Sequence, residues 1–346
     1  MHGGPGLELR RGARLSAKPD PARREAPDAR ERPGRNCPLA YRYSPRVFDR
    51  EPQLEAEVVY VAGGLYGNLE ALAAIQALAA REGRAVKIVF NGDFHWFDVR
   101  PDDFSAVTDE ALRHAALRGN VETEVAVDES DAGCGCAYPA DVSDAEVSRS
   151  NEIMARLRAT ARLAPGPRAR LGALPMHLTA RVGDARIGIV HGDAASLAGW
   201  GFAQDRMDEP AHARWIAGAF RDARVDVFAS AHTCLPALRL FDVDGRRAAV
   251  ANNGAAGMPN FAGTRYGLLT RIATRAFSGQ ERVYGAQVAG VHVEALRIDY
   301  DHARWLGRFV ASWPPGSPAH ASYHRRIVEG ARHDPGVAAP RLAAAV

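Results

Sequence analysis

The sequence has few of the features that membrane-spanning and secreted proteins need. No stretch of its 346 residues approaches the roughly 20 apolar residues of a membrane span. The first residues, MHGGPGLELRRGARL, contain no apolar run of the length found in a signal peptide. We therefore expect a protein that makes no membrane contact and works in the cytoplasm.

Lysine is almost absent, since Lys18 and Lys87 stand beside 42 arginines. The formal net charge is +3, but residues 1–36 contain nine basic and five acidic residues, so the rest of the chain carries −1. A nucleic-acid-binding face needs clustered cations that displace counterions from phosphates. The chain beyond residue 36 therefore predicts no broad nucleic-acid surface.

Cysteine is scarce too, and a chain of the cytosol seldom uses it for disulfides. Cys134 and Cys136 lie in the glycine-containing stretch DAGCGCAYP. One interpretation is a second metal or redox site that includes Cys37. Because Cys-x-Cys spacing is a weak signal without two more ligands, loop sulfurs that share no partner are the favoured interpretation.

The composition divides the chain into four parts. Residues 1–36 contain five prolines and few large apolar side chains, which predicts a flexible, dispensable tail. Residues 37–56 are expected to form a packed N-terminal arm, and residues 57–312 the main domain. Residues 313–346 are expected to form a C-terminal helical extension and tail.

From Glu57 onward, short apolar strands alternate with helical patterns, which indicates an α/β fold. Antiparallel strands follow, with a turn signal at Asp244-Gly245. Strands are predicted near 58–63 and 87–93, and helices near 68–82, 106–117, 144–163, 209–221, 301–311 and 319–331, with a loop insert at 123–143.

Four polar residues follow the ends of apolar strands: Asp93, Asn120, His191 and His232. The carboxyl ends of strands in an open sheet converge on one crevice, so these side chains are expected to meet. Taken singly, they have structural explanations as turn residues, helix caps or core histidines. Together they favour a metal site, and mixed oxygen and nitrogen donors suit Mn, Fe, Zn, Co or Ni better than Ca or Mg.

The motifs occur in the order G-N-L-E-A-L, G-D, G-N-x-E, H-G-D and H-T over about residues 58–265. This order resembles the calcineurin-like metallophosphoesterases, especially their small bacterial phosphodiesterase branch. The resemblance implies a four-layer sandwich of two mixed β-sheets flanked by helices. It also implies that Asp93 bridges two metals, and that Asn120, His191 and His232 complete the ligands of one of them.

The chain departs from this family at the other metal. Gly64, Tyr66 and Cys234 stand where the family has an aspartate and two histidines, and Val121 replaces a histidine that is the general acid in many relatives. The resemblance therefore implies a divalent transition metal at one retained position, one ion per chain.

Two explanations remain for the substituted half. Tyr66 as a phenolate and Cys234 as a thiolate are possible substitute ligands. The alternative is an inert thiol and a ring that fills the space of the lost metal. His95, two residues beyond Asp93, is predicted as an added catalytic group, with an exposed loop histidine as its structural alternative.

The resemblance implies a metal-dependent phosphoesterase that hydrolyses a phosphomonoester or phosphodiester by means of a metal-bound hydroxide. Asp93 and His95 are the predicted catalytic residues, and a small phosphorylated molecule is the predicted substrate or ligand. One alternative is a non-catalytic relative that binds phosphate, a nucleotide or a metal. Another is different chemistry at a remodelled metal centre.

Overall fold

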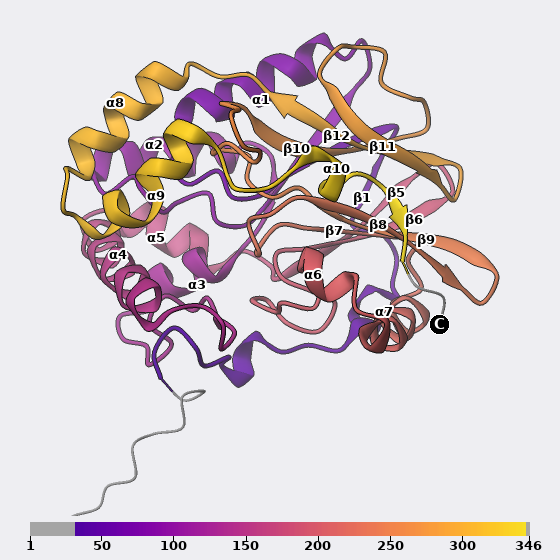
Figure 1. Ribbon diagram of the computed structural model, residues 1–346, viewed down its shortest axis with the longest axis horizontal. Helices are drawn as coiled ribbons and strands as arrows, with labels where there is room; N and C mark the ends of the chain where they lie inside the picture. The colour runs from indigo at the N-terminus through magenta and orange to yellow at the C-terminus, as the bar shows by residue number, and fades with distance from the viewer. Residues whose placement is uncertain (1–31, 344–346) are drawn as a thin grey trace, which may run out of the picture.

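Two mixed β-sheets pack face to face, and helices cover their outer surfaces, which gives four layers (Figure 1). This computed structural model describes residues 32–343. The α/β four-layer sandwich expected from the motif order is confirmed.

The larger sheet has seven strands in the order β1-β5-β6-β7-β9-β8-β13, and the smaller has six in the order β11-β12-β10-β2-β3-β4. Their bounds are β1 Leu54–Ala56, β2 Val58–Ala62, β3 Val86–Asn91, β4 Ala115–Leu117, β5 His177–Val182, β6 Ala185–Val190, β7 Val227–Ser230, β8 Ala237–Val243, β9 Arg246–Asn252, β10 Gly267–Ala273, β11 Arg282–Val288, β12 Val291–Ile298 and β13 Arg341–Leu342.

Strand β2 is apolar on both faces because both are covered. Val58 and Tyr60 face the core beneath the outer helices, while Val59 and Val61 face the core between the two sheets. Successive side chains of a strand point to opposite faces, so a strand with two covered faces shows a continuous apolar run. Burial of both faces therefore explains the continuous apolar run that predicted a strand here.

Helices α1, α2 and α8 lie over the smaller sheet, and α7 lies over the larger sheet (Figure 1). Within residues 32–343, no helix has both the length and the apolar character needed to cross a membrane. The helix bounds are α1 Leu69–Arg81, α2 Pro101–Ala111, α3 Asn120–Ala126, α4 Asp144–Arg162, α5 Pro165–Gly172, α6 Gln204–Met207, α7 Pro210–Ala223, α8 His302–Ser312, α9 Pro318–Glu329 and α10 Pro335–Ala338.

The helix predicted near 106–117 is wrong in its second half. The observed helix α2 ends at Ala111, and β4 pairs with β3 in parallel, so that Ala116 lies opposite Phe90. Alanine has the highest helix propensity, but propensity is a weak determinant, and pairing with a neighbouring strand overrides it here. The edge strand places the turn that carries Asn120.

The predicted flexible tail, residues 1–36, lies mostly outside the described part of the chain. Its last residues, 32–36, are not flexible. The Gly34 N–H donates to the Ala132 carbonyl at 2.8 Å, and the Tyr138 N–H donates to the Gly34 carbonyl at 2.9 Å. Backbone hydrogen bonds thus join residues 32–36 to the insert loop, and the role of the rest of the tail stays a prediction.

We expect replacement of Arg35 by alanine to lower the free energy of unfolding by about 1–3 kcal/mol, since it removes side-chain bonds from a mostly buried group. Arg35 donates to the carbonyls of Pro139 and Val142 at 2.7 and 2.6 Å. Urea denaturation measures the change. Arg46→Ala is the matched control, because that side chain is 77% exposed. Equal effects of the two changes would contradict a structural role for Arg35.

The C-terminal extension is helical as predicted, and it is also integrated into the body. Trp313 is buried and its indole N–H donates to the Phe97 carbonyl at 2.9 Å. Strand β13 adds to the larger sheet beside β8. Residues 313–343 therefore form part of the same folded unit, and helix α9 reaches the pocket described below.

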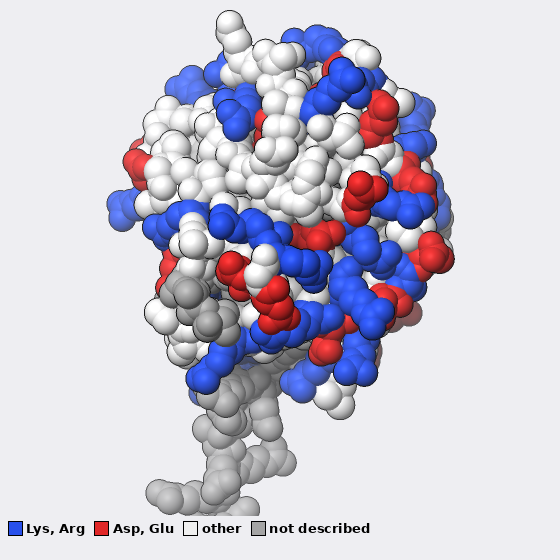
Figure 2. Space-filling model, turned by 90° about the vertical axis from the view of Figure 1, so that its right-hand side faces the viewer, with Lys and Arg blue, Asp and Glu red and all other residues white. Residues whose placement is uncertain are grey.

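The surface is rich in arginine, but many of these side chains lie beside carboxylates. Figure 2 shows one face on which basic and acidic side chains are intermixed. Arg221, for example, donates two hydrogen bonds to Asp244, at 2.9 and 3.0 Å. Such exposed pairs add little stability, but they offset positive charge locally.

Candidate metal centre

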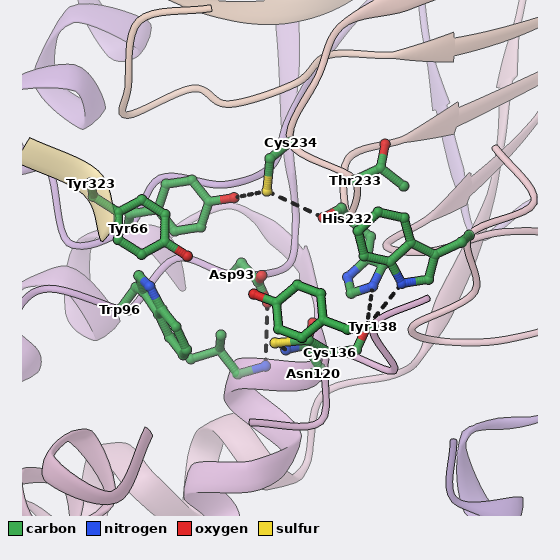
Figure 3. Close-up of a pocket in the computed structure, with 12 residues that line it drawn as sticks. Tyr66, Asp93, Trp96, Asn120, Cys136, Tyr138, His232, Thr233, Cys234 and Tyr323 are labelled. Atoms are coloured by element: carbon green, nitrogen blue, oxygen red, sulfur yellow. Dashed lines mark hydrogen bonds between the residues drawn. The ribbon is translucent and has the colours of Figure 1, made fainter. Parts of the chain in front are cut away.

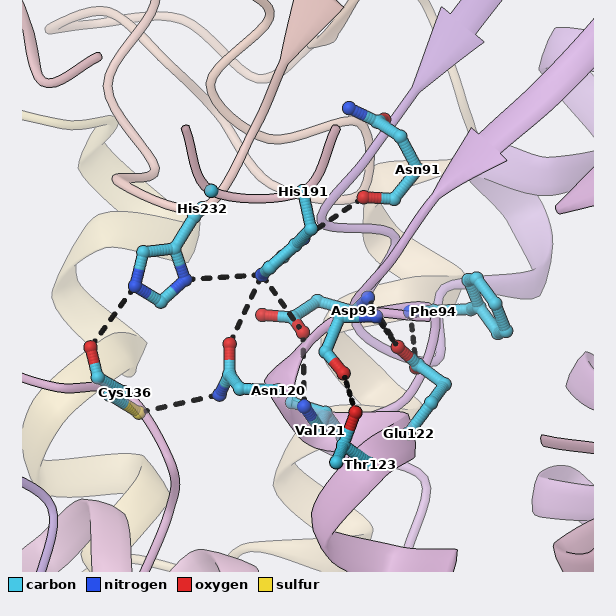
Figure 4. Close-up of polar contacts among 12 residues, drawn as sticks. Asn91, Asp93, Phe94, Asn120, Val121, Glu122, Thr123, Cys136, His191 and His232 are labelled. Atoms are coloured by element: carbon cyan, nitrogen blue, oxygen red, sulfur yellow. Dashed lines mark hydrogen bonds and ion pairs between the residues drawn. The ribbon is translucent and has the colours of Figure 1, made fainter. Parts of the chain in front are cut away.

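Four buried side chains meet at one point between the two sheets (Figure 4). The Nε2 atom of His191 lies 3.0 Å from Asn120 Oδ1, 3.1 Å from His232 Nδ1 and 3.3 Å from Asp93 Oδ1. The ligand atoms of Asp93, His191 and His232 all lie within 4.8 Å of one another. The structure thus brings together the four residues predicted as metal ligands.

Both sheets contribute to this point. Asp93 and Asn120 follow β3 and β4 of the smaller sheet, while His191 and His232 follow β6 and β7 of the larger one. These four strands end at the same edge of the sandwich, where loops converge on a crevice. The four side chains therefore come from four separate loops, and the packing of the two sheets brings them together.

Backbone carbonyls fix which nitrogen of each imidazole carries the proton. The Nδ1–H of His191 donates to the Asn91 carbonyl at 2.9 Å, and the Nε2–H of His232 donates to the Cys136 carbonyl at 3.0 Å. The opposite nitrogens, Nε2 of His191 and Nδ1 of His232, then carry lone pairs. These are the two nitrogens that face each other at 3.1 Å.

The amide of Asn120 is oriented in the same way. Its Nδ2 donates to the Cys134 carbonyl at 3.0 Å, which leaves Oδ1 facing His191. An oxygen, two nitrogens and the Asp93 carboxylate therefore converge as acceptors with no donor among them when both rings are neutral. Such a set is stabilised by a cation or by a proton on His191, so the residues present fit a divalent metal.

The pKa values of the two histidines also indicate that this centre is stabilised by one positive charge. Burial opposes protonation of His191, but the Asp93 carboxylate and the bond to the Asn91 carbonyl raise its pKa overall. Burial and the neighbouring His191 lower the pKa of His232 to about 3. The centre thus accepts one positive charge, a proton on His191 or a metal ion.

We expect metal binding near pH 6 to release about one proton, since His191 is charged there without the ion and His232 is already neutral. Metal affinity should then fall about tenfold for each pH unit below the raised pKa of His191. Calorimetric titration in buffers of different ionisation enthalpy counts the protons. Release of two protons per ion would show that both rings are charged without metal.

Glu122 of the G-N-x-E motif holds the turn that presents Asp93. Its carboxylate accepts the backbone N–H groups of Asp93, Phe94 and Gly119 at 2.8, 2.9 and 2.8 Å. Asp93 has a φ of 55°, and a Cβ at Gly119 would lie 2.3 Å from its Oδ1. The motif thus builds a strained turn in which only glycine leaves room for the carboxylate.

The catalytic role predicted for His95 does not fit its position. The ring is fully buried and stacks on Phe104 with centroids 4.1 Å apart. Its Nδ1 lies 2.6 Å from Asp98 Oδ2 and its Nε2 lies 3.0 Å from Thr108 Oγ1, so both nitrogens have partners. His95 does not line the pocket, and it braces the loop after Asp93 from behind. It is not an exposed loop histidine either.

Side chains fill the space at which the resemblance implies a second metal in the family. The Tyr66 hydroxyl donates to Cys234 Sγ at 2.7 Å, and that thiol donates to the His232 carbonyl at 3.2 Å. A Cβ at Gly64 would lie 2.9 Å from the Tyr66 ring, so the ring stands over this glycine. Burial raises the pKa of both Tyr66 and Cys234, which keeps them neutral and disfavours the forms that bind metal.

The other cysteines do not converge on a shared site. Cys37 Sγ lies 3.4 Å from Ser196 Oγ, while Cys134 Sγ accepts the Cys136 N–H at 3.4 Å. Within residues 32–343, the sulfurs belong to no group of three metal-ligating side chains. The contribution of Cys136 is its carbonyl, which orients His232, and its thiol, which lines the pocket.

A pocket of about 160 Å³ opens beside the four ligands (Figure 3). Its wall includes Thr233 of the H-T motif and four residues that sequence reasoning missed, because they come from separate loops and from α9. These four are Trp96, Tyr138, Trp200 and Tyr323. Of the four, Trp96 is the one beside a motif, in the loop that follows Asp93.

No protein-family model matches the chain, and the comparison with curated proteins gives no match. Among solved structures, the hypothetical protein PH1004 from Pyrococcus horikoshii OT3 aligns with a TM-score of 0.53 and 15% identity, over 80% of this chain and 99% of that one. The chain has a metallophosphoesterase-like fold. A metallophosphoesterase from Sphaerobacter thermophilus aligns with a TM-score of 0.48 and 19% identity, over 80% of this chain and 100% of that one. With this fold, the motif order and the position of the ligands agree with the resemblance to the calcineurin-like superfamily.

Proposed function

We propose that this protein is a metal-dependent phosphoesterase with one metal position per chain. One observation carries the proposal. Four side chains direct acceptor atoms at one point, because backbone carbonyls accept the N–H groups of Asn120, His191 and His232 on the opposite side. The metallophosphoesterase-like fold supports it. The small phosphorylated substrate and a cytoplasmic location, both expected from the sequence, are part of the proposal.

In this proposal, Asp93, Asn120, His191 and His232 hold the ion. A divalent transition metal there would act as a Lewis acid toward a phosphoryl oxygen. The Asn91 and Cys136 carbonyls keep both imidazoles in the ligating tautomer, and Glu122 keeps the Asp93 turn in place. The pocket wall excludes water from the bound ester, which strengthens electrostatic interactions there.

The filled half-site favours one competing function. Because Tyr66 and Cys234 take the place of the second metal's ligands, the two-metal clamp on attacking and leaving oxygens is missing. A relative that only binds a phosphorylated ligand or a metal would have the same ligand set. Different chemistry at a remodelled centre is the third candidate, with the Tyr66 and Cys234 pair as its motivating feature.

Hydrolysis of phosphoesters by protein loaded separately with Mn, Fe, Zn, Co or Ni tests the proposal. We expect release of 4-nitrophenol from bis(4-nitrophenyl) phosphate or 4-nitrophenyl phosphate with at least one metal, and loss of that release in Asp93→Asn. Asp205→Asn, an exposed aspartate on α6, is the matched control and should keep the rate. Bound metal without hydrolysis of either ester would favour the binding-only relative.

A further inference from the structure

We propose that the pocket beside the metal centre selects monoanionic phosphodiesters that carry at least one aromatic ester group. This inference rests on the proposed phosphoesterase function and names its substrate class. Three independent features of the pocket lead to it: its aromatic walls, its lack of cationic side chains and its lack of an acid for the leaving group.

Five aromatic side chains line the pocket: Tyr66, Trp96, Tyr138, Trp200 and Tyr323. Trp200 is held in place because its indole N–H donates to the Cys136 carbonyl at 3.0 Å, and its ring lies 6.0 Å from that of Tyr138. The volume of about 160 Å³ is close to that of an apolar protein cavity of about 150 Å³ that binds benzene. The pocket therefore has the size and surface for one aromatic ring.

Within residues 32–343, no lysine or arginine lines the pocket. The Arg326 guanidinium lies behind the wall, where it donates to the carbonyls of Cys234 and Pro259 at 2.8 and 3.1 Å. A divalent ion and the Asp93 carboxylate together would have a net charge of about +1. The buried Glu122 carboxylate can only lower this net charge. A phosphodiester monoanion balances that charge, whereas a phosphomonoester dianion would bring an unpaired charge into an aromatic cavity.

The pocket also offers no good proton donor to a leaving group. Val121 stands at the position of the histidine that is the general acid in many relatives, and His232 is turned toward the ligand cluster. The Tyr66 hydroxyl is directed at Cys234 Sγ, and burial raises the pKa of Tyr138 and Tyr323, so these two phenols are weak acids. An aryl ester suits such a site, since phenols have a pKa of about 10 and their anions leave without prior protonation.

The reaction for this substrate class is hydrolysis at phosphorus. The oxygen of water forms a bond to phosphorus, and the bond from phosphorus to the aryl oxygen breaks with its electron pair on that oxygen. The phenolate then takes up the proton that the water gives up. The products are a phosphomonoester and a phenol, and no oxidant, reductant or other co-reactant is needed.

Binding of three simple phosphates to the metal-loaded protein tests the inference without relying on turnover. We expect diphenyl phosphate to bind roughly tenfold more tightly than dimethyl phosphate, which lacks the ring. It should also bind more tightly than phenyl phosphate at pH 8, where phenyl phosphate is a dianion. Equal affinities for the three ligands would overturn the proposal. Displacement of diphenyl phosphate by tetramethylammonium would also overturn it, because the aromatic side chains would then bind a cation.

Variants of Trp200 assign the effect to the pocket wall. Trp200→Leu should weaken diphenyl phosphate binding roughly tenfold more than it weakens dimethyl phosphate binding, because only the ring loses its partner. Trp200→Phe keeps an aromatic face and should retain most of the preference, which separates stacking from the lost hydrogen bond. Trp215→Leu, on helix α7, is the matched control and should change neither affinity.

The two proposals can fail separately. A preference for diphenyl phosphate in a protein that hydrolyses no phosphoester would sustain the substrate class and overturn the enzymatic function. Hydrolysis of both 4-nitrophenyl phosphate and bis(4-nitrophenyl) phosphate at similar kcat/KM would sustain the enzymatic function and overturn the substrate class.

Discussion

Replacement of Asp93 by asparagine is expected to remove the metal from the protein. Asp93 supplies the only carboxylate among the four ligand side chains, so the change takes away the one negative charge that faces the ion. Loss of even an indirect partner of a metal costs about 10–100-fold in affinity, and loss of this direct ligand should cost at least as much. Metal analysis after dialysis should find almost none in the variant, and phosphoester hydrolysis should fall with it.

The fold of Asp93→Asn should survive, because the asparagine oxygen can still accept the Val121 N–H that now lies 3.3 Å from Asp93 Oδ1. Thermal unfolding of the metal-free proteins checks this point. The metal-free variant and the metal-free parent should melt at similar temperatures, and only the parent should melt higher when metal is added. A variant that keeps its metal and its activity would place the centre elsewhere.

The second large effect is expected when the substituted half of the centre is rebuilt. The triple change Gly64→Asp, Tyr66→His and Cys234→His replaces the ring and the thiol by the ligands that the family uses. Metal content should rise from one toward two ions per chain, and phosphodiester hydrolysis should increase, because a two-metal site clamps both the attacking and the leaving oxygen.

The order of the changes matters, since the Tyr66 ring covers Gly64. Gly64→Asp alone should destabilise the protein by about 1–3 kcal/mol through overpacking against the ring. Tyr66→His in the same chain should relieve most of that cost. The φ of 67° at Gly64 is a smaller obstacle, because aspartate tolerates it better than most residues. A triple variant that binds no second ion would contradict the view that this half is only filled.

Single changes separate a filled half-site from a rebuilt one. Tyr66→Phe keeps the ring but removes the hydroxyl that donates to Cys234. We expect metal content to stay unchanged in this variant, because neither group is ionised in its buried position. Loss of metal in Tyr66→Phe or in Cys234→Ser would favour the remodelled centre instead.

The meeting of the four side chains could be predicted because strand ends and motifs lie close together in the sequence. Asp93, Asn120, His191 and His232 each follow a short apolar strand, and the sandwich brings those ends to one edge. The turn at Asp244-Gly245 followed from similarly local information, and it joins β8 to β9 as expected.

The pocket wall could not be predicted, because its residues are close only in space. Tyr323 comes from α9 and Tyr138 from the insert loop. No pattern in the sequence near either residue indicates that it lies close to Asp93. His95 shows the opposite failure. It lies next to a motif, but a bond to Asp98 and stacking on Phe104 turn its ring into the core. Proximity along the chain does not decide which way a loop side chain points.

The number of metal ions in protein purified without added metal tests the central claim most directly. Elemental analysis against protein concentration gives this number without any assumption about substrate. The four convergent ligands and the filled half-site predict one transition-metal ion per chain, which is lost in Asp93→Asn and kept in Tyr66→Phe. Two ions per chain, or none even after incubation with Mn, Fe, Zn, Co or Ni, would contradict the account.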